Sequence, residues 1–406
     1  MRYEETLNFI HSLGRFSEEP TLERMRCVMN KLSNPQNKFK TIHIAGTNGK
    51  GSTSAFISTV LKEFGLKVGL FTSPFIIDFR ERIQINGEYI LKEDLSRLAQ
   101  KVIDTDIKLT EFEFITAIAF LYFAEKDIDI LVCETGLGGR FDATNIIENK
   151  IACVITKIGL DHTEILGDTI DKIAGEKCGI LRDCPTVTTY NQPAMAISVI
   201  KEKAKMLIVS DASEIKILSS DIGNTYIYKD KKYEIGLSGE YQIENSVLAI
   251  ECLNALELNI PYDIIFKGLK NAFIPARLEI ISQKPLVVLD GAHNPDGAKA
   301  LVNELSKQSE KVTAIIGMCK DKDYEEFLKE TLAHCKFAVV VEIEGVPRSL
   351  TALQLKATAC KYCDCEIAEN YRSALETAFT TADKGPIFIF GSLYLAAGIR
   401  NLLRSI

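Results

Sequence analysis

Short apolar runs alternate with segments of helical periodicity along most of the chain. Strands are expected at residues 41–45, 67–72, 129–134, 151–155 and 186–189, and residues 205–238 are rich in further strand-forming residues. Helices are expected at residues 3–14, 22–32, 52–64, 95–103, 112–124, 170–178 and 243–256. Asp94 and Thr110 are the expected caps of two of these helices, and Asn86-Gly87 predicts a hairpin. Strands that alternate with helices are typical of βαβ units, so we predict an α/β fold with a mostly parallel sheet.

A second series of strands follows a linker, which we place at residues 272–276. Four apolar runs, at residues 286–289, 312–316, 338–342 and 387–390, are again separated by helical segments. At 406 residues the chain is longer than one hydrophobic core usually serves. We therefore predict a large N-terminal domain at residues 1–273 and a smaller α/β domain at residues 278–406.

Composition and charge exclude several classes of protein. The chain is 46% hydrophobic and 25% charged, as in ordinary globular proteins. Its net charge of −7 argues against a general nucleic-acid binder, while a local basic groove stays open as an alternative. The N-terminus lacks a signal-peptide pattern, and the longest uncharged stretch, residues 385–399, is too short to span a bilayer. We expect a cytoplasmic protein with no membrane partner. Its eleven cysteines are accordingly expected to be reduced, and the cluster of Cys360, Cys363 and Cys365 is either a zinc site or a plain strand edge.

The candidate chemistry begins directly after the first predicted strand. Glycines at positions 46, 49 and 51 surround Lys50, and a helix follows. Such a turn points backbone N–H groups and the positive end of the helix dipole at one spot, where a lysine can neutralise phosphate. The common pattern has glycine where this chain has Ala45 and a hydroxyl residue where it has Gly51, and a glycine-rich turn without a ligand is the alternative. We predict a phosphate-binding P-loop that comprises Thr47, Asn48, Gly49, Lys50, Gly51, Ser52 and Thr53.

Oxygen and imidazole ligands follow the ends of three other strands. Ser73 precedes Pro74, Glu134 precedes a glycine-rich turn, and His162 lies in an Asp-His pair. Carboxylate and hydroxyl oxygens suit Mg²⁺, whereas imidazole suits it less well. A hydrogen-bonded histidine at a strand end is the alternative for His162. Open α/β sheets bind ligands beyond the carboxyl ends of their strands, which is where all of these residues lie.

At this point the sequence resembles a known family, the folylpolyglutamate synthases of the Mur ligase superfamily, which include bifunctional dihydrofolate synthases. The resemblance covers nearly the whole chain. Its marks in the first domain are AGTNGKGST at 45–53, TSPF at 72–75, RERI at 80–83, ETGLGGRFDATN at 134–145, ITKIGLDHTEILG at 155–167, IAGEKCGI at 173–180 and GEYQIEN at 239–245. They continue with PARLEI at 275–280, LDGAHNPDG at 289–297, GMCKDKD at 317–323 and GSLYLAAGIR at 391–400.

The resemblance implies a reaction. A ligase of this family uses ATP and Mg²⁺ to add L-glutamate to the γ-carboxyl of a reduced folate through an acyl phosphate. Bifunctional members also join glutamate to dihydropteroate, which the sequence leaves undecided here. The implied partners are these small molecules, and we expect a monomer.

The resemblance also assigns roles to residues. It places two Mg²⁺ ions on Ser52, Ser73, Glu134 and His162. Lys177 matches the family lysine that is carbamylated, although a surface lysine near a helix end is the plain alternative. Nucleotide contacts fall to Asn245, Arg277 and Asp290, and a phosphate contact to His293. For Arg277 the alternative is a solvated linker charge, and for Asp290 it is an ordinary turn.

Five residues differ from the family pattern, and two other functions are rivals. Phe75, Thr135, Phe141 and Cys178 differ from frequent residues of the family, and Ala276 replaces a common glycine before Arg277.

A nucleotide switch is a rival from another class, but the Thr156–Gly159 segment lacks the aspartate of a guanine-reading motif. A peptidoglycan-precursor ligase is the nearer rival because it shares the chemistry.

Overall fold

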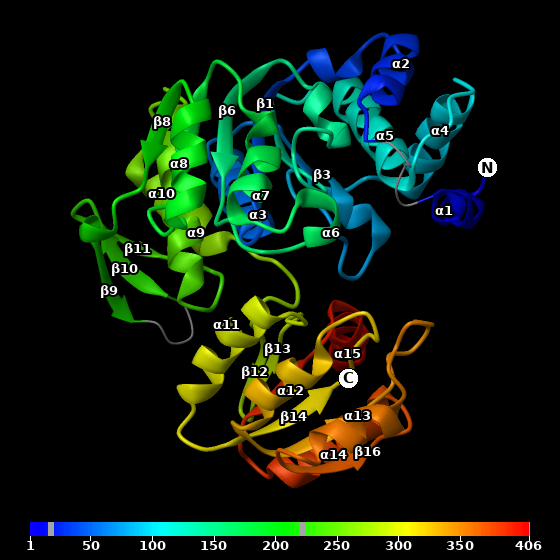
Figure 1. Ribbon diagram of the computed structural model, residues 1–406, viewed down its shortest axis with the longest axis vertical. Coiled ribbons are helices and arrows are strands. Elements are labelled where there is room, and N and C mark those ends of the chain that lie inside the picture. Colours follow the sequence, from blue (N-terminus) through cyan, green and yellow to red (C-terminus); the bar gives the residue numbers. More distant parts are fainter. Residues whose placement is uncertain (15–19, 220–223, 406) are drawn as a thin grey trace. The chain divides into compact units, whose positions relative to one another are not determined.

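The computed structural model describes residues 1–14, 20–219 and 224–405 of the chain. These residues form two compact units (Figure 1). The first unit runs from Met1 to Ala272, except for Leu237–Tyr241, which belongs to the second unit together with the residues from Phe273 onward. Each unit has its own sheet and its own hydrophobic core.

The first unit is built on a sheet that contains eight strands among the described residues, in the order β4-β3-β2-β5-β1-β6-β7-β8. All neighbours in the sheet pair in parallel except β2–β3 and β3–β4, which are antiparallel. The strands are β1 (Lys40–Ala45), β2 (Val68–Phe71), β3 (Ile83–Ile85), β4 (Glu88–Tyr89), β5 (Ile130–Glu134), β6 (Lys150–Ile155), β7 (Pro185–Thr188) and β8 (Met206–Val209). The prediction of a mostly parallel sheet is confirmed.

Helices cover both faces of this sheet, as the apolar runs of its central strands require. The helices are α1 (Tyr3–Ser12), α2 (Glu23–Lys31), α3 (Lys50–Glu63), α4 (Lys92–Ile103), α5 (Glu111–Glu125), α6 (Thr163–Leu166), α7 (Ile170–Lys177), α8 (Ala194–Lys203), α9 (Tyr241–Ala255) and α10 (Tyr262–Asn271). Helix α3 packs against β1, β2 and β5, and α10 packs on α3. One core joins α1, α2, α4 and α5 to Phe71, Leu131 and Cys133 of the sheet, and another joins α7 and α8 to β6.

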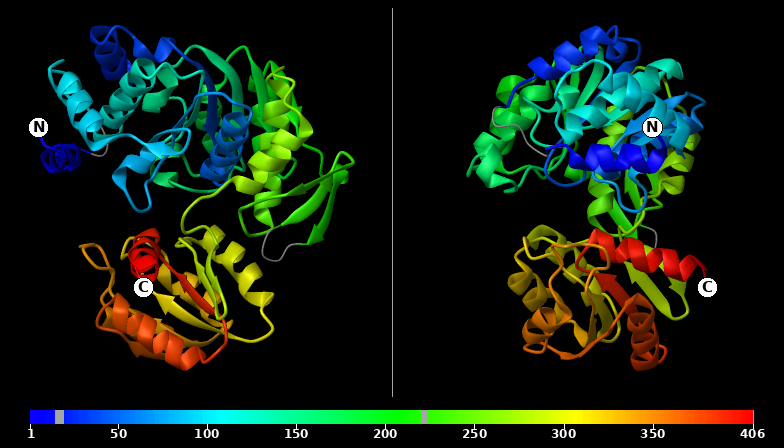
Figure 2. Two further views of the ribbon diagram at one scale, coloured as in Figure 1. Left: turned by 180° about the vertical axis from the view of Figure 1, so that it is seen from behind. Right: turned by 90° about the vertical axis from the view of Figure 1, so that its right-hand side faces the viewer.

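A small antiparallel sheet lies beside α9 and α10. It consists of β9 (Ile215–Ser219), β10 (Thr225–Tyr228) and β11 (Lys231–Glu234) and is drawn in green in Figure 2. Tyr226 and Tyr228 are buried, and their hydroxyl groups bond to Ser246 and Glu251 of α9. The strand-rich character expected for this region is therefore present, as β8 and this separate sheet.

The second unit is a smaller α/β layer structure. Its sheet has six strands among the described residues, in the order β12-β13-β17-β14-β15-β16, and only the β12–β13 pair is antiparallel. The strands are β12 (Glu279–Gln283), β13 (Leu286–Leu289), β14 (Val312–Ile316), β15 (Cys335–Val340), β16 (Asp364–Ile367) and β17 (Ile387–Phe390). The helices are α11 (Pro295–Ser306), α12 (Tyr324–Leu332), α13 (Ala352–Ala359), α14 (Tyr371–Ala382) and α15 (Leu393–Ser405).

Several local predictions need correction. Thr110 caps α5 through a hydrogen bond from the Glu113 N–H, but α4 begins earlier than expected, so Asp94 lies in its first turn and pairs with Arg97 instead. Helix α3 likewise begins at Lys50, inside the glycine-rich loop. The sheet of the second unit also gains two edge strands, β12 and β16, which the apolar pattern did not reveal.

The expectation that all cysteines are reduced is wrong. Cys360 and Cys365 form a disulfide between the end of α13 and the edge strand β16. No group of three or more His, Cys, Asp or Glu side chains in the described part of the chain could hold a metal ion. The disulfide uses two of the three sulfur atoms of the cluster, so neither the zinc site nor a plain strand edge with reduced cysteines describes it. Among the described residues, no helix has the length and apolar character needed to cross a bilayer.

Candidate active site

The glycine-rich loop joins β1 to α3 and is folded tightly against its neighbours. Gly46 and Gly49 have φ angles of +154° and +89°, and a Cβ atom would lie 1.8 Å from the Thr156 hydroxyl at Gly46 and 2.2 Å from the Asn245 amide oxygen at Gly49. Only glycine fits these two positions. The backbone N–H groups of Thr47 and Asn48 donate to the Lys157 carbonyl, at 3.0 and 3.1 Å.

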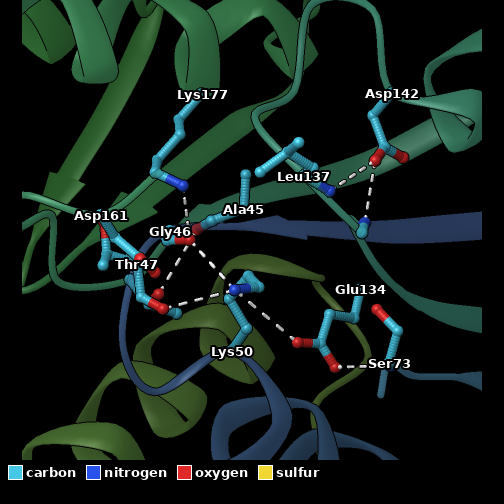
Figure 3. A network of polar contacts seen from close by, with 12 residues as sticks. Ala45, Gly46, Thr47, Lys50, Ser73, Glu134, Leu137, Asp142, Asp161 and Lys177 are labelled. Atoms are coloured by element: carbon cyan, nitrogen blue, oxygen red, sulfur yellow. Dashed lines mark hydrogen bonds and ion pairs between the residues drawn. The ribbon is translucent and has the colours of Figure 1, made fainter. Parts of the chain in front are cut away.

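Lys50 lies at the centre of the loop. Its ammonium group donates to the carbonyl oxygens of Gly46 and Thr47, at 3.2 and 3.3 Å, and lies 3.9 Å from a carboxylate oxygen of Glu134 (Figure 3). The other oxygen of Glu134 accepts a 3.3 Å hydrogen bond from the Ser73 N–H. The ends of β1, β5 and β2 thus place a lysine, a buried carboxylate and a serine together, as expected from the parallel sheet.

Lys177 approaches the same loop from α7. Its amine donates to the Gly46 carbonyl at 2.8 Å, so two lysines share one acceptor (Figure 3). Burial and then the charge of Lys50 lower the pKa of Lys177 to about 7, while Asp161 acts in the opposite direction. The alternative of a surface lysine is wrong, because the side chain is buried.

The turn after Glu134 is held by a residue that sequence reasoning missed. The buried Asp142 carboxylate accepts hydrogen bonds from the N–H groups of Gly136 and Leu137, at 2.8 and 2.9 Å, and Figure 3 shows Asp142 beside Leu137. It also accepts one from the Thr144 N–H. Burial raises the pKa of Asp142, and these hydrogen bonds partly offset that effect. An acid at the end of a glycine-rich run was the available signal, since such turns need an acceptor for their N–H groups.

The remaining candidates of the first unit lie in different surroundings. Ser52 and Thr53 are buried in the first turn of α3, and the Thr53 hydroxyl has no hydrogen-bond partner among the described residues. Gly51 is also at this turn, where a Cβ atom would lie 3.7 Å from Glu134. The side chain of His162 is 54% exposed and lies 3.7 Å from Asp161. The contacts of the described residues do not join His162 to Glu134, Ser52 or Ser73.

Asn245 comes from α9 and lies directly against the loop at Gly49. Its amide nitrogen donates to the buried Gln242 side chain at 2.9 Å. The structure therefore joins Asn245 to the P-loop although 196 positions separate Asn245 from Gly49 in the sequence (245 minus 49).

The other three candidates belong to the second unit. Asp290 is buried at the end of β13 and accepts hydrogen bonds from the N–H groups of Leu278 and Ala292, each at 2.8 Å. Burial raises its pKa, and the Arg277 charge opposes that shift. His293 shares a 2.8 Å hydrogen bond with the Gly291 carbonyl. Asp290 is therefore more than the ordinary turn residue of our alternative, since it fixes the backbone beside Arg277.

Comparisons with known proteins agree with this geometry. The Mur ligase middle domain matches residues 44–253, and the Mur ligase glutamate ligase domain matches residues 276–393. The folylpolyglutamate synthase of Lacticaseibacillus casei is 35% identical, and the dihydrofolate synthase/folylpolyglutamate synthase of Bacillus subtilis (strain 168) is 37% identical, each over 99% of both chains. The structure of Mycobacterium tuberculosis folylpolyglutamate synthase complexed with ADP and AMPPCP matches with a TM-score of 0.87, 30% identity and 99% coverage of both chains.

The P-loop on a parallel sheet, followed by a glutamate ligase domain, defines a Mur ligase, an ATP-dependent enzyme that forms C–N bonds. Within this superfamily, the chain belongs to the folylpolyglutamate synthase family. The resemblance found in the sequence is thus confirmed. This family membership excludes the two rival functions, the nucleotide switch and the peptidoglycan-precursor ligase.

We predict that Lys50→Ala lowers the rate of ATP turnover by about 10²–10³, the usual cost of losing an electrostatic group in a transition state. Lys62→Ala, which changes an exposed lysine on the same helix, is the matched control and should retain full activity. Steady-state ADP release and circular dichroism of both variants make the measurement. Activity of Lys50→Ala within twofold of wild type would show that this loop is not the phosphate site.

We predict that Lys177 makes stability depend on pH. Its pKa is about 7 in the folded chain, against an ordinary value of 10.5, so the unfolded chain binds more protons between these two pH values. The free energy of unfolding of wild type should therefore rise with pH from about 7 to about 10.5, relative to Lys177→Met. Urea unfolding in CO₂-depleted buffer measures this, with Lys201→Met as the exposed control. A difference that does not change with pH would contradict the buried, neutral lysine.

Proposed function

We propose that this enzyme joins the amine of L-glutamate to the γ-carboxyl group of tetrahydrofolate and converts ATP to ADP and phosphate. The single observation that carries the proposal is the group formed by Lys50, Glu134 and Ser73 at the P-loop, because it suits a nucleotide phosphate beside a reacting carboxylate. The names of the relatives support the choice of folate and glutamate as substrates.

The proposed chemistry overcomes the low reactivity of a carboxylate. The γ-phosphoryl group of ATP passes to the folate carboxylate, and this acyl phosphate is then attacked by the amine of glutamate, so that phosphate leaves. Positioning and charge neutralisation supply most of the rate. Lys50 leaves the carbonyl groups of Gly46 and Thr47 to neutralise phosphate charge, and the N–H groups at the start of α3 bind phosphate oxygens.

The oxygen ligands at this site fit Mg²⁺. Glu134 offers a buried carboxylate that already faces a lysine, and Ser52 and Ser73 lie on the adjoining turns. We propose that these three residues hold Mg²⁺, which neutralises phosphate charge when it is bound. We propose His162 as a ligand of a second ion. This role requires its exposed side chain to turn toward the site.

Lys177 is suited to carbamylation. The reaction with CO₂ needs a neutral amine, and burial beside Lys50 supplies one near pH 7. We propose that Lys177 carries a carbamate, whose negative charge balances Lys50 and the metal. In the second unit we propose nucleotide contacts for Arg277 and Asp290, and a phosphate contact for His293. In the first unit we propose a nucleotide contact for Asn245 of α9. We also propose that the enzyme is monomeric and cytoplasmic.

A second acceptor, dihydropteroate, is favoured by one observation. The relative from Bacillus subtilis is named for both dihydrofolate synthase and folylpolyglutamate synthase, and it matches this chain along its full length. We propose that the same P-loop serves both acceptors, because each presents a carboxylate to the same phosphoryl donor.

The proposed function predicts glutamate-dependent release of ADP with tetrahydrofolate, and release with dihydropteroate if the second activity is present. Purified enzyme is assayed with each acceptor, with and without glutamate, and Lys50→Ala is the control for contaminating ATPase. The proposed function would be contradicted if neither tetrahydrofolate nor dihydropteroate caused the release of ADP. Release with tetrahydrofolate alone would remove the second acceptor from the proposal.

The carbamate predicts a chemical rescue. Lys177→Ala should lose activity and regain part of it with added short-chain carboxylates, which can occupy the vacated anionic position. Sodium chloride at the same ionic strength is the control for salt, and Lys50→Ala, which lacks a cation rather than an anion, should not be rescued. Full activity of Lys177→Ala in CO₂-depleted buffer without added acid would refute the carbamate.

A further inference from the structure

The backbone on both sides of Arg277 has an unfavourable conformation. Ala276 has a φ angle of +51° and Leu278 one of +47°, in the left-handed region that non-glycine residues seldom adopt. Both side chains are buried, so the local structure must hold this turn in place. Arg277 is the residue that the turn presents, and it is only partly buried.

Two buried carboxylates hold the peptide groups that flank Arg277. Glu279 accepts a hydrogen bond from the Ala276 N–H at 2.9 Å, and Asp290 accepts one from the Leu278 N–H at 2.8 Å. The Ala276 carbonyl in turn accepts a 2.8 Å hydrogen bond from the Gly291 N–H. The turn is thus fixed at both of its left-handed residues.

The Glu279 carboxylate is itself fixed by the last helix of the chain. Arg400 of α15 donates from Nε to both carboxylate oxygens, each at 2.8 Å. The exposed fractions of the two side chains are 7% for Arg400 and 4% for Glu279, so water screens this ion pair little. Loss of the guanidinium group would leave a buried carboxylate without this counter-charge, and the carboxylate would no longer be held at the Ala276 N–H.

We propose that Arg400 and Glu279 are positioning residues for nucleotide binding, which act by holding the left-handed turn that presents Arg277. The inference rests on the proposed nucleotide contact of Arg277. It assigns a function in nucleotide binding to helix α15, whose Arg400 is 123 residues beyond Arg277 in the sequence (400 minus 277). It also explains how this chain tolerates Ala276 in a conformation that favours glycine.

A double-mutant cycle separates positioning from a general structural role. Arg277→Ala, Arg400→Lys and the double variant are compared with wild type for the KM of ATP, the KM of glutamate and kcat, and calorimetry with ADP measures nucleotide binding without folate. Arg400→Lys keeps the charge but loses the guanidinium geometry, so it has a better prospect of folding than Arg400→Met. Lys307→Met removes a partly exposed ion pair with Glu304 in the same unit and is the matched control.

We expect Arg400→Lys to raise the KM of ATP and the Kd of ADP about tenfold, an order-of-magnitude estimate from the cost of the left-handed region. The KM of glutamate and the control variant should be unchanged. In the Arg277→Ala background the same substitution should have no further effect, because coupled residues are not additive. Ala276→Gly should restore part of the ADP affinity of Arg400→Lys, since glycine adopts the turn without the clamp.

Several results would overturn the proposal. One is a folded Arg400→Lys variant, verified by thermal unfolding, whose ADP affinity is within twofold of wild type. Another is an equal loss of ADP affinity with and without Arg277, which would make the ion pair merely structural. Failure of the proposed function has a different signature, because wild type would then show no folate-dependent ADP release while ADP binding remained measurable.

Discussion

Two lysine side chains share one carbonyl oxygen, that of Gly46 at the end of the central strand β1, and the site depends on this arrangement. Lys50 and Lys177 donate to it from different helices, and Glu134 is the carboxylate that faces Lys50. Burial and then the charge of Lys50 lower the pKa of Lys177, and the charge of Lys50 attracts anions to the loop. A nucleotide phosphate and a carbamate would both lower the electrostatic energy of this site, which is why one loop can account for both parts of the proposed chemistry.

Buried carboxylates organise turns in each of the two units. Asp142 holds the turn after Glu134, and Asp290 and Glu279 hold the turn around Arg277 in the second unit. In each case a carboxylate accepts backbone N–H groups that no strand or helix satisfies, so burial of the charge is offset by hydrogen bonds. Such groups are costly to remove, and they keep the functional side chains in place before any ligand binds.

Strands with a continuous apolar run and loops rich in glycine could be predicted from the sequence. It identified β1, β2, β5, β6 and β7 and the convergence of Lys50, Ser73 and Glu134, because parallel strands end at one edge of a sheet. It missed β12 and β16, since edge strands are half exposed and lack a continuous apolar pattern. It could not give the burial of Lys177 or the Arg400–Glu279 pair, because both depend on contacts between residues more than a hundred positions apart. The cysteine prediction failed for a different reason: the two cysteines are only five positions apart, but the prediction rested on the expected compartment rather than on geometry.

The most direct test of the central claim is a crystal structure of the enzyme with Mg²⁺ and an ATP analogue whose γ-phosphate cannot be cleaved. The account predicts phosphate oxygens on the backbone N–H groups from Gly49 to Ser52, with the Lys50 ammonium moved from the Gly46 carbonyl onto phosphate. A nucleotide bound elsewhere, or phosphates at the loop with Lys50 still bonded to Gly46 and Thr47, would contradict it.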